Sequence, residues 1–408
     1  MTFTSEKGQK PKTLRLKPDQ STVQLIIHGQ GVMLFRHTNP DKFCVFDLYN
    51  HDKTDGLRVE LTEHVVLVSR ISTGQSYIDL NNTSGLVTDS GAYYWCSLDA
   101  QNQALRCGVG EARMETAIYG FIMESSERVA NKAFMESIET IQVAMDSDVQ
   151  PIKLLRDPIT CPIPALVKPM DELTMDQIAS GSYLPKGVLP LVAQQLHDCI
   201  AGRQFTLDTD DFPDFVQAIE KSITSGWCYK RLQEKSHEFS KDKPNLDETY
   251  LRITLGQNNG ESPGIPYVME IWPVGHYSPV HNHSEAHAII RVLHGTITVS
   301  QFPFLSPTVK PFAITDFHKD QITWISPTLN QTHQLRNLPG NAATCITIQC
   351  YLYDQKDNGH YDYFDYVDAD GAIQQYEPDS DMDFVEFKKL MREEWGQRET
   401  SWWGRCFS

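Results

Sequence analysis

Two histidines separated by a single residue constrain this chain more than any other feature. His281 and His283 lie in the segment WPVGHYSPVHNHSEAHAIIRVLHG, which runs from Trp272 to Gly295. Side chains alternate between the two faces of an extended strand, so we expect both imidazoles to point to the same side. A third candidate, His333, follows in NQTHQLRN. Three imidazoles from two separate segments would form a facial site that binds a divalent transition metal and leaves positions open for substrate and oxygen.

An HxH pair can also arise by chance, because the chain contains 14 histidines. This pair, however, lies in a strand-like stretch with Gly275 before it and Gly295 after it, and His333 precedes another β-rich segment. We therefore interpret His281, His283 and His333 as metal ligands.

Composition and charge limit the possible partners. The 408 residues are enough for two domains, and 40% hydrophobic residues are ordinary for a protein with a buried core. The formal net charge of -17 argues against binding to nucleic acid or to an anionic membrane, both of which favour a basic face. No window is long and apolar enough to span a bilayer, and the N-terminal segment lacks the apolar stretch of a secretory signal. We therefore expect a cytoplasmic protein with neither nucleic acid nor membrane as a partner.

The nine cysteines support the same location. Their number is odd, and no two of them show the CxxC spacing of a zinc or redox site. We expect reduced thiols, several of them buried as small hydrophobic side chains.

Strand-like segments dominate the first part of the chain. We expect residues 1–13 to form a disordered tail and residues 14–150 to form a β-rich domain, because short apolar runs alternate there with Gly, Asn and Asp turns. Segment 127–145 predicts an amphipathic helix, and the proline-rich residues 151–186 predict a connection between domains. The role of the β-rich domain stays open between a lectin-like module, a lid and a module that forms a homo-oligomer.

Residues 187–408 predict a second domain that begins with helices. LPLVAQQLHDCIAG and FPDFVQAIEKSITSG have helical periodicity, and the strand-like segments that follow carry the three histidines. In the tail DFVEFKKLMREEW, one helical stripe fits core packing better than partner binding; it contains Phe384, Phe387, Met391 and Trp395.

Residues 187–365 resemble the cysteine dioxygenase family of thiol dioxygenases, which are small cupins. The family pattern W-x-x-G-H-x-S-x-x-H-x-H is present as Trp272, Gly275, His276, Ser278, His281 and His283. The resemblance implies a mainly β fold: a C-terminal cupin jelly roll with N-terminal helices, preceded by a separate, sandwich-like β-rich domain. It also implies that His281, His283 and His333 bind Fe(2+).

The same resemblance implies two further site residues. Arg252, in ETYLRIT, would bind the substrate, since a guanidinium grips a carboxylate with two hydrogen bonds. Tyr351, in TIQCYLY, would be the active-site tyrosine. From the residues alone, a solvated arginine at a strand edge and a tyrosine in the core remain alternatives.

Three departures from the family pattern concern the same region. Ala288 stands where eukaryotic members have a cysteine that is crosslinked to the tyrosine, so this crosslink cannot form. Gln349, with Thr347 before it, replaces the histidine of a Ser-His-Tyr relay, and an amide does not titrate. We place Gln349 among the substrate-binding residues. An insertion at residues 256–266 lies near the expected pocket.

Glu285 is the main competitor for a metal-binding role, since many cupins add a glutamate ligand near this point. It comes too soon after His283, where we expect a turn, so we do not expect it to bind the metal. His276 and His287 are expected to orient ligands or to pack.

The function expected from this resemblance is an iron(II)-dependent thiol dioxygenase. It would oxidise cysteine or a related amino thiol to its sulfinic acid with O2. One alternative is a metal-cupin enzyme that acts on a small non-thiol substrate, and another is a non-catalytic metal-cupin sensor or binding protein.

Overall fold

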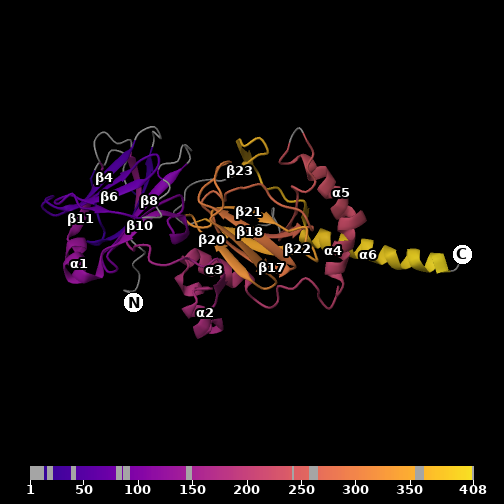
Figure 1. Cartoon of the computed structure of the whole chain (residues 1–408). Coiled ribbons are helices and arrows are strands. Elements are labelled where there is room, and N and C mark those ends of the chain that lie inside the picture. Colours follow the sequence, from indigo (N-terminus) through magenta and orange to yellow (C-terminus); the bar gives the residue numbers. More distant parts are fainter. Residues whose placement is uncertain are drawn as a thin grey trace. The chain divides into compact units, whose positions relative to one another are not determined.

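The chain forms two compact units, Met1–Ile163 and Pro164–Ser408, in a computed structural model (Figure 1). The structure describes residues 13–15, 22–37, 43–79, 85, 92–143, 149–240, 243–256, 265–353 and 363–406. Strands predominate, so the predicted mainly β class is confirmed. Within these residues, no helix is both long enough and apolar enough to cross a membrane.

The first unit is a sandwich of two six-stranded sheets. One sheet contains, in spatial order, β1 (Thr13–Arg15), β12 (Val149–Leu155), β3 (Gln30–His37), β8 (Tyr93–Asp99), β9 (Ala104–Val109) and β10 (Ala117–Ile122). The other contains β2 (Thr22–Gln24), β11 (Ile138–Val143), β4 (Cys44–Asn50), β5 (Gly56–Leu61), β6 (Val66–Arg70) and β7 (Ser76–Tyr77). Phe35 of β3 meets Phe46 of β4 with ring centroids 5.3 Å apart, so the two sheets face each other across an apolar core.

The helix predicted over residues 127–145 is wrong in its second half. Helix α1 covers Arg128–Glu136, and the chain then enters strand β11, which pairs with both β2 and β4. Ile138, Ile141 and Val143 are buried in this strand. β-Branched residues pack well on a half-buried sheet, and two neighbouring strands satisfy the backbone on both sides, so tertiary pairing overrides the helical pattern.

Residues 151–186 are divided between the two units and are not a separate connection. Strand β12 pairs with β3 along its length, which places residues up to Leu155 in the sandwich. The first unit continues to Ile163, and the residues from Pro164 onward form parts of the second unit: β13 (Val167–Lys168), α2 (Met175–Ala179) and β14 (Leu184–Pro185). Of the tail predicted at residues 1–13, only Thr13 lies within the described residues, and it begins β1.

The second unit is a jelly roll with two facing sheets. The larger contains, in order, β20 (Ile322–Ile325), β17 (His287–His294), β22 (Cys345–Leu352), β16 (Tyr267–Trp272), β15 (Leu251–Leu255) and β25 (Met382–Asp383). The smaller contains β19 (Ala313–His318), β18 (Thr296–Phe302) and β21 (Thr332–Arg336), and β23 (Phe364–Val367) pairs with β24 (Ile373–Tyr376). Both sheets contribute to one buried cluster, which includes Trp272, Val292, Ile297, Phe317 and Leu335.

Helices cover the outside of the larger sheet and leave its inner face to the pocket. Arg291 of β17 points outward and donates to the carbonyl of Ile200, the last residue of α3 (Leu191–Ile200). Helices α4 (Phe215–Ser225), α5 (Trp227–Glu234) and α6 (Phe384–Cys406) form a group. Phe215 of α4 contacts Phe387 of α6. The alternation along β17 turns Ile290 and Val292 inward.

Candidate metal centre

The segment with His281 and His283 is extended but is not the regular strand that we predicted. His281 forms an isolated bridge with His333, in which each backbone N–H donates to the other carbonyl at 3.0 Å. After His283 the chain turns through Ser284 and Glu285, which have positive φ values of 46° and 62°, and β17 begins only afterwards. The bridge therefore holds His281 beside His333, although His281 is not part of a regular strand.

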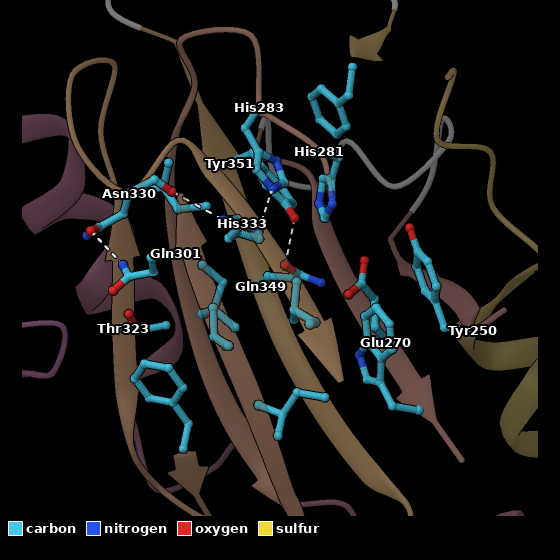
Figure 2. Close-up of a pocket in the computed structure, with 18 of the residues that line it drawn as sticks. Tyr250, Glu270, His281, His283, Gln301, Thr323, Asn330, His333, Gln349 and Tyr351 are labelled. Carbon is cyan, nitrogen blue, oxygen red and sulfur yellow. Dashed lines mark hydrogen bonds between the residues drawn. The ribbon is translucent and has the colours of Figure 1, made fainter. Parts of the chain in front are cut away.

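The three imidazoles converge on one point (Figure 2). One ring nitrogen from each of His281, His283 and His333 lies within 4.8 Å of the others. The Nε2 atoms of His283 and His333 are 3.1 Å apart. Two nitrogens that bind one metal ion at about 2.0–2.1 Å and at a right angle are about 3 Å apart, so this spacing fits a shared ion. The three residues together could hold a metal.

Backbone carbonyls orient two of the rings. The Nδ1 atom of His281 lies 3.1 Å from the Pro279 carbonyl, and that of His333 lies 3.2 Å from the Asn330 carbonyl. A carbonyl only accepts, so each Nδ1 carries the proton and each Nε2 keeps its lone pair for a metal. Asn330 has a positive φ of 63°, and its side chain donates to the Trp324 carbonyl at 2.9 Å. This contact holds the turn that positions His333.

Burial keeps the three imidazoles neutral. It lowers the pKa of His281 to about 4 and that of His333 to about 3, and it lowers the pKa of His283 well below the ordinary value. The neighbouring imidazoles add to the effect on His283 and His333. A neutral imidazole is the form that binds a metal, so the site is ready for an ion at neutral pH.

These pKa values predict that acid destabilises the metal-free protein. An unfolded histidine titrates near 6.5, so between about pH 7 and pH 4 the unfolded chain binds more protons than the folded chain. The free energy of unfolding should therefore fall by an amount on the order of several kcal/mol as the pH is lowered through this window. Urea unfolding at pH 7.5, 6 and 5 measures the change. In the variant His281→Gln/His333→Gln the slope should be shallower, and an equal slope would contradict the prediction.

The other polar residues of the motif do not join the three histidines. Glu285 is exposed on the turn and is not part of the group that could hold a metal. The Nδ1 atom of His276 lies 2.9 Å from the Thr249 carbonyl, so this ring fixes the preceding loop and does not orient a ligand imidazole. Ser278 accepts from the backbone N–H of Leu335 at 3.1 Å and thereby joins the loop to β21.

Arg252, Gln349 and Tyr351 line the same pocket as the three histidines. The Tyr351 hydroxyl donates to Oε1 of Gln349 at 2.6 Å (Figure 2). Burial raises the pKa of Tyr351 well above its ordinary value, which keeps the hydroxyl protonated. Among the residues that the structure describes, the buried Thr347 hydroxyl has no hydrogen-bond partner, so it does not extend the contact between Tyr351 and Gln349.

The register of β17 against β22 shows which residue lies where a crosslink to Tyr351 would form. Ala288 of β17 lies directly opposite Tyr351 of β22, and it is fully buried. A cysteine at residue 288 would be next to the tyrosine, whereas alanine offers no sulfur. Of the insertion predicted at residues 256–266, residues 257–264 lie outside the described part of the chain.

Sequence reasoning missed Glu270. This residue of β16 lines the pocket and accepts from Nη1 of Arg252 at 2.7 Å, and both side chains are buried. Burial raises the pKa of Glu270 above its ordinary value, although Arg252 acts in the opposite direction. The available signal was a lone carboxylate inside the otherwise apolar strand segment YVMEIW.

Aromatic and aliphatic side chains form most of the remaining wall. Phe364 lies 4.7 Å from the His283 ring, and Tyr250 stacks on Trp272 at 4.1 Å. An apolar wall lowers the local dielectric constant, so the electrostatic interactions of the few polar groups in the pocket are stronger.

Comparisons with known proteins give only weak similarities. No protein-family model and no curated protein matches the chain. The cupin domain of Schizosaccharomyces pombe Cnp3 is 12% identical with a TM-score of 0.20, and the match covers 26% of this chain and 64% of that one. A double-stranded β-helix protein from Klebsiella pneumoniae is 13% identical with a TM-score of 0.21, over 35% of this chain and 89% of that one. L-ribose isomerase from Cellulomonas parahominis is 12% identical with a TM-score of 0.19, over 25% and 55%.

Proposed function

We propose that this protein is an iron(II)-dependent dioxygenase that converts a small thiol to its sulfinic acid with O2. The observation that carries the proposal is the convergence of three neutral imidazoles in a pocket that also contains Arg252 and Tyr351. Three neutral ligands would leave a dipositive ion its full charge, which favours an anionic thiolate as a further ligand. The substrate would be cysteine or a related amino thiol.

The polar residues have separate tasks in this proposal. His281, His283 and His333 would hold the iron(II) ion, which would supply the redox chemistry between the thiol and dioxygen. Arg252 would position a carboxylate where the substrate has one. Tyr351 would turn its O–H from Gln349 to donate a hydrogen bond to the oxygen added to sulfur. The apolar wall would exclude water and hold the reactants close together.

The test is oxygen-dependent turnover of the iron-loaded protein. The full chain is loaded with iron(II) without oxygen, mixed with cysteine or 2-aminoethanethiol, and exposed to ¹⁸O2. We expect consumption of one O2 per sulfinate and both labelled oxygen atoms on sulfur, detected by mass spectrometry.

Other outcomes would support the other two functions. Tight thiol binding without oxygen uptake would support a sensor or binding protein. Iron binding with no thiol binding would contradict the proposal and favour a non-thiol substrate. The amide of Gln349 and the ion pair of Arg252 are the two features that make this second enzyme class worth testing.

A further inference from the structure

Glu270 is the single carboxylate on the wall of the pocket, as far as the described residues show. It lies on β16, where residues 268, 270 and 272 face the inside of the jelly roll. Its side chain is almost completely buried, and its place on the pocket wall can be followed in Figure 2. A buried carboxylate needs a partner, and the partner of this one is the arginine that would otherwise meet the substrate.

The contact between Glu270 and Arg252 is built into the sheet. The two residues are direct cross-strand partners on β15 and β16, and Nη1 donates to Oε1 at 2.7 Å. Asp381 holds the Arg252 backbone from both directions: its carboxylate accepts from the Arg252 N–H at 2.7 Å, and its own N–H donates to the Arg252 carbonyl at 2.8 Å. The arginine therefore keeps its place beside Glu270.

This contact changes which thiol the pocket favours. A substrate carboxylate that approaches Arg252 must lie beside a second carboxylate on the same guanidinium, and like charges at this distance repel in a buried site. A thiol without a carboxylate does not meet this repulsion. An amine on the thiol is attracted by Glu270, so an amino group is favoured where a carboxylate is not.

We propose that Glu270 occupies the place of a substrate carboxylate on Arg252, so that the site selects a small amino thiol without a carboxylate. The inference rests on the proposed thiol oxidation and names its substrate class. The reaction would be RS⁻ + O2 → RSO2⁻: two S–O bonds form, the O–O bond breaks, sulfur loses four electrons and O2 gains them. The amine is unchanged.

Three small thiols that differ only in their amine and carboxylate groups test this charge preference. 2-Aminoethanethiol has an amine alone, cysteine has an amine and a carboxylate, and 3-sulfanylpropanoate has a carboxylate alone. For the iron(II)-loaded full chain, we expect kcat/KM to be about tenfold or more higher for 2-aminoethanethiol than for cysteine, and lowest for 3-sulfanylpropanoate. Anaerobic calorimetry of each thiol with the loaded protein should give the same order of affinity.

The variant Glu270→Gln removes the competing charge and keeps the shape of the side chain. The affinity for cysteine and for 3-sulfanylpropanoate should then rise about 10- to 100-fold relative to 2-aminoethanethiol, because Arg252 becomes available to a carboxylate. In Glu270→Gln/Arg252→Gln this gain should disappear. The exposed Glu386 of α6 provides a matched control, and Glu386→Gln should keep the wild-type order.

Each result decides between the two proposals. A wild-type preference for cysteine, or an unchanged order in Glu270→Gln, would overturn the inference about Glu270 while leaving thiol oxidation intact. If no thiol is oxidised, the proposed function fails, and the calorimetric order still tests the charge preference of the pocket. The wild-type order is measured on the unaltered chain, so it decides even if Glu270→Gln does not fold.

Discussion

The variant His283→Ala should lose the metal binding that we propose for the three histidines. His283 is one of three imidazoles that share a centre, and its Nε2 lies 3.1 Å from that of His333. Removal of an outer hydrogen-bond partner alone weakens metal binding by about 10- to 100-fold, so loss of a ligand should weaken it by more than about 100-fold. We expect bound iron to fall from one equivalent to near zero, and oxygen-dependent turnover to fall below detection. Metal analysis after gel filtration measures the first effect.

A histidine far from the centre provides the control for this prediction. His318, on β19, is exposed, and its Nδ1 contacts the Thr296 hydroxyl at 3.1 Å. His318→Ala should bind iron as the unaltered chain does. Iron at one hundred times its Kd should stabilise the unaltered chain and His318→Ala by about 2.7 kcal/mol, but should not stabilise His283→Ala. Full iron loading of His283→Ala would contradict the three-histidine site.

The first two histidines of the cluster were predictable because their signal is local. His281 and His283 are two residues apart, and an extended backbone turns both rings the same way whether or not the segment forms a regular strand. The strands of the jelly roll were also predictable in outline, since β17 and β22 are short segments rich in apolar and β-branched residues, and most of their residues are buried.

What the sequence did not predict depends on contacts between distant segments. The pairing of Glu270 with Arg252 follows from the register of β15 against β16, which the intervening insertion hides. Residues 138–143 were predicted as helix because their polar and apolar spacing fits a helical face, and only the two neighbouring strands make them a strand. In both cases the structure depends on pairing with a neighbouring strand, and the periodicity of a single segment cannot identify that strand.

Asp381 shows how strongly such a distant contact supports the site. Its side chain is only 1% exposed, and its carboxylate accepts from Nε of Arg231 at 2.8 Å and from Nζ of Lys235 at 3.2 Å. It also accepts from the backbone N–H of Arg252 at 2.7 Å. A single carboxylate thus joins the segment before β25 to α5 and to the strand that carries the pocket arginine.

The variant Asp381→Ala should therefore be strongly destabilised. It would leave the buried Lys235 ammonium and the Arg252 N–H without this acceptor, and loss of one partner from a buried ion pair costs about 3–5 kcal/mol. Glu234→Ala is the matched control, because Glu234 bonds the same Arg231 at 3.1 Å from a side chain that is 65% exposed. A helical surface pair of this kind contributes only about 0.2–0.5 kcal/mol. Urea unfolding of both variants measures the difference, and equal effects would show that Asp381 does not hold α5 and β15 together.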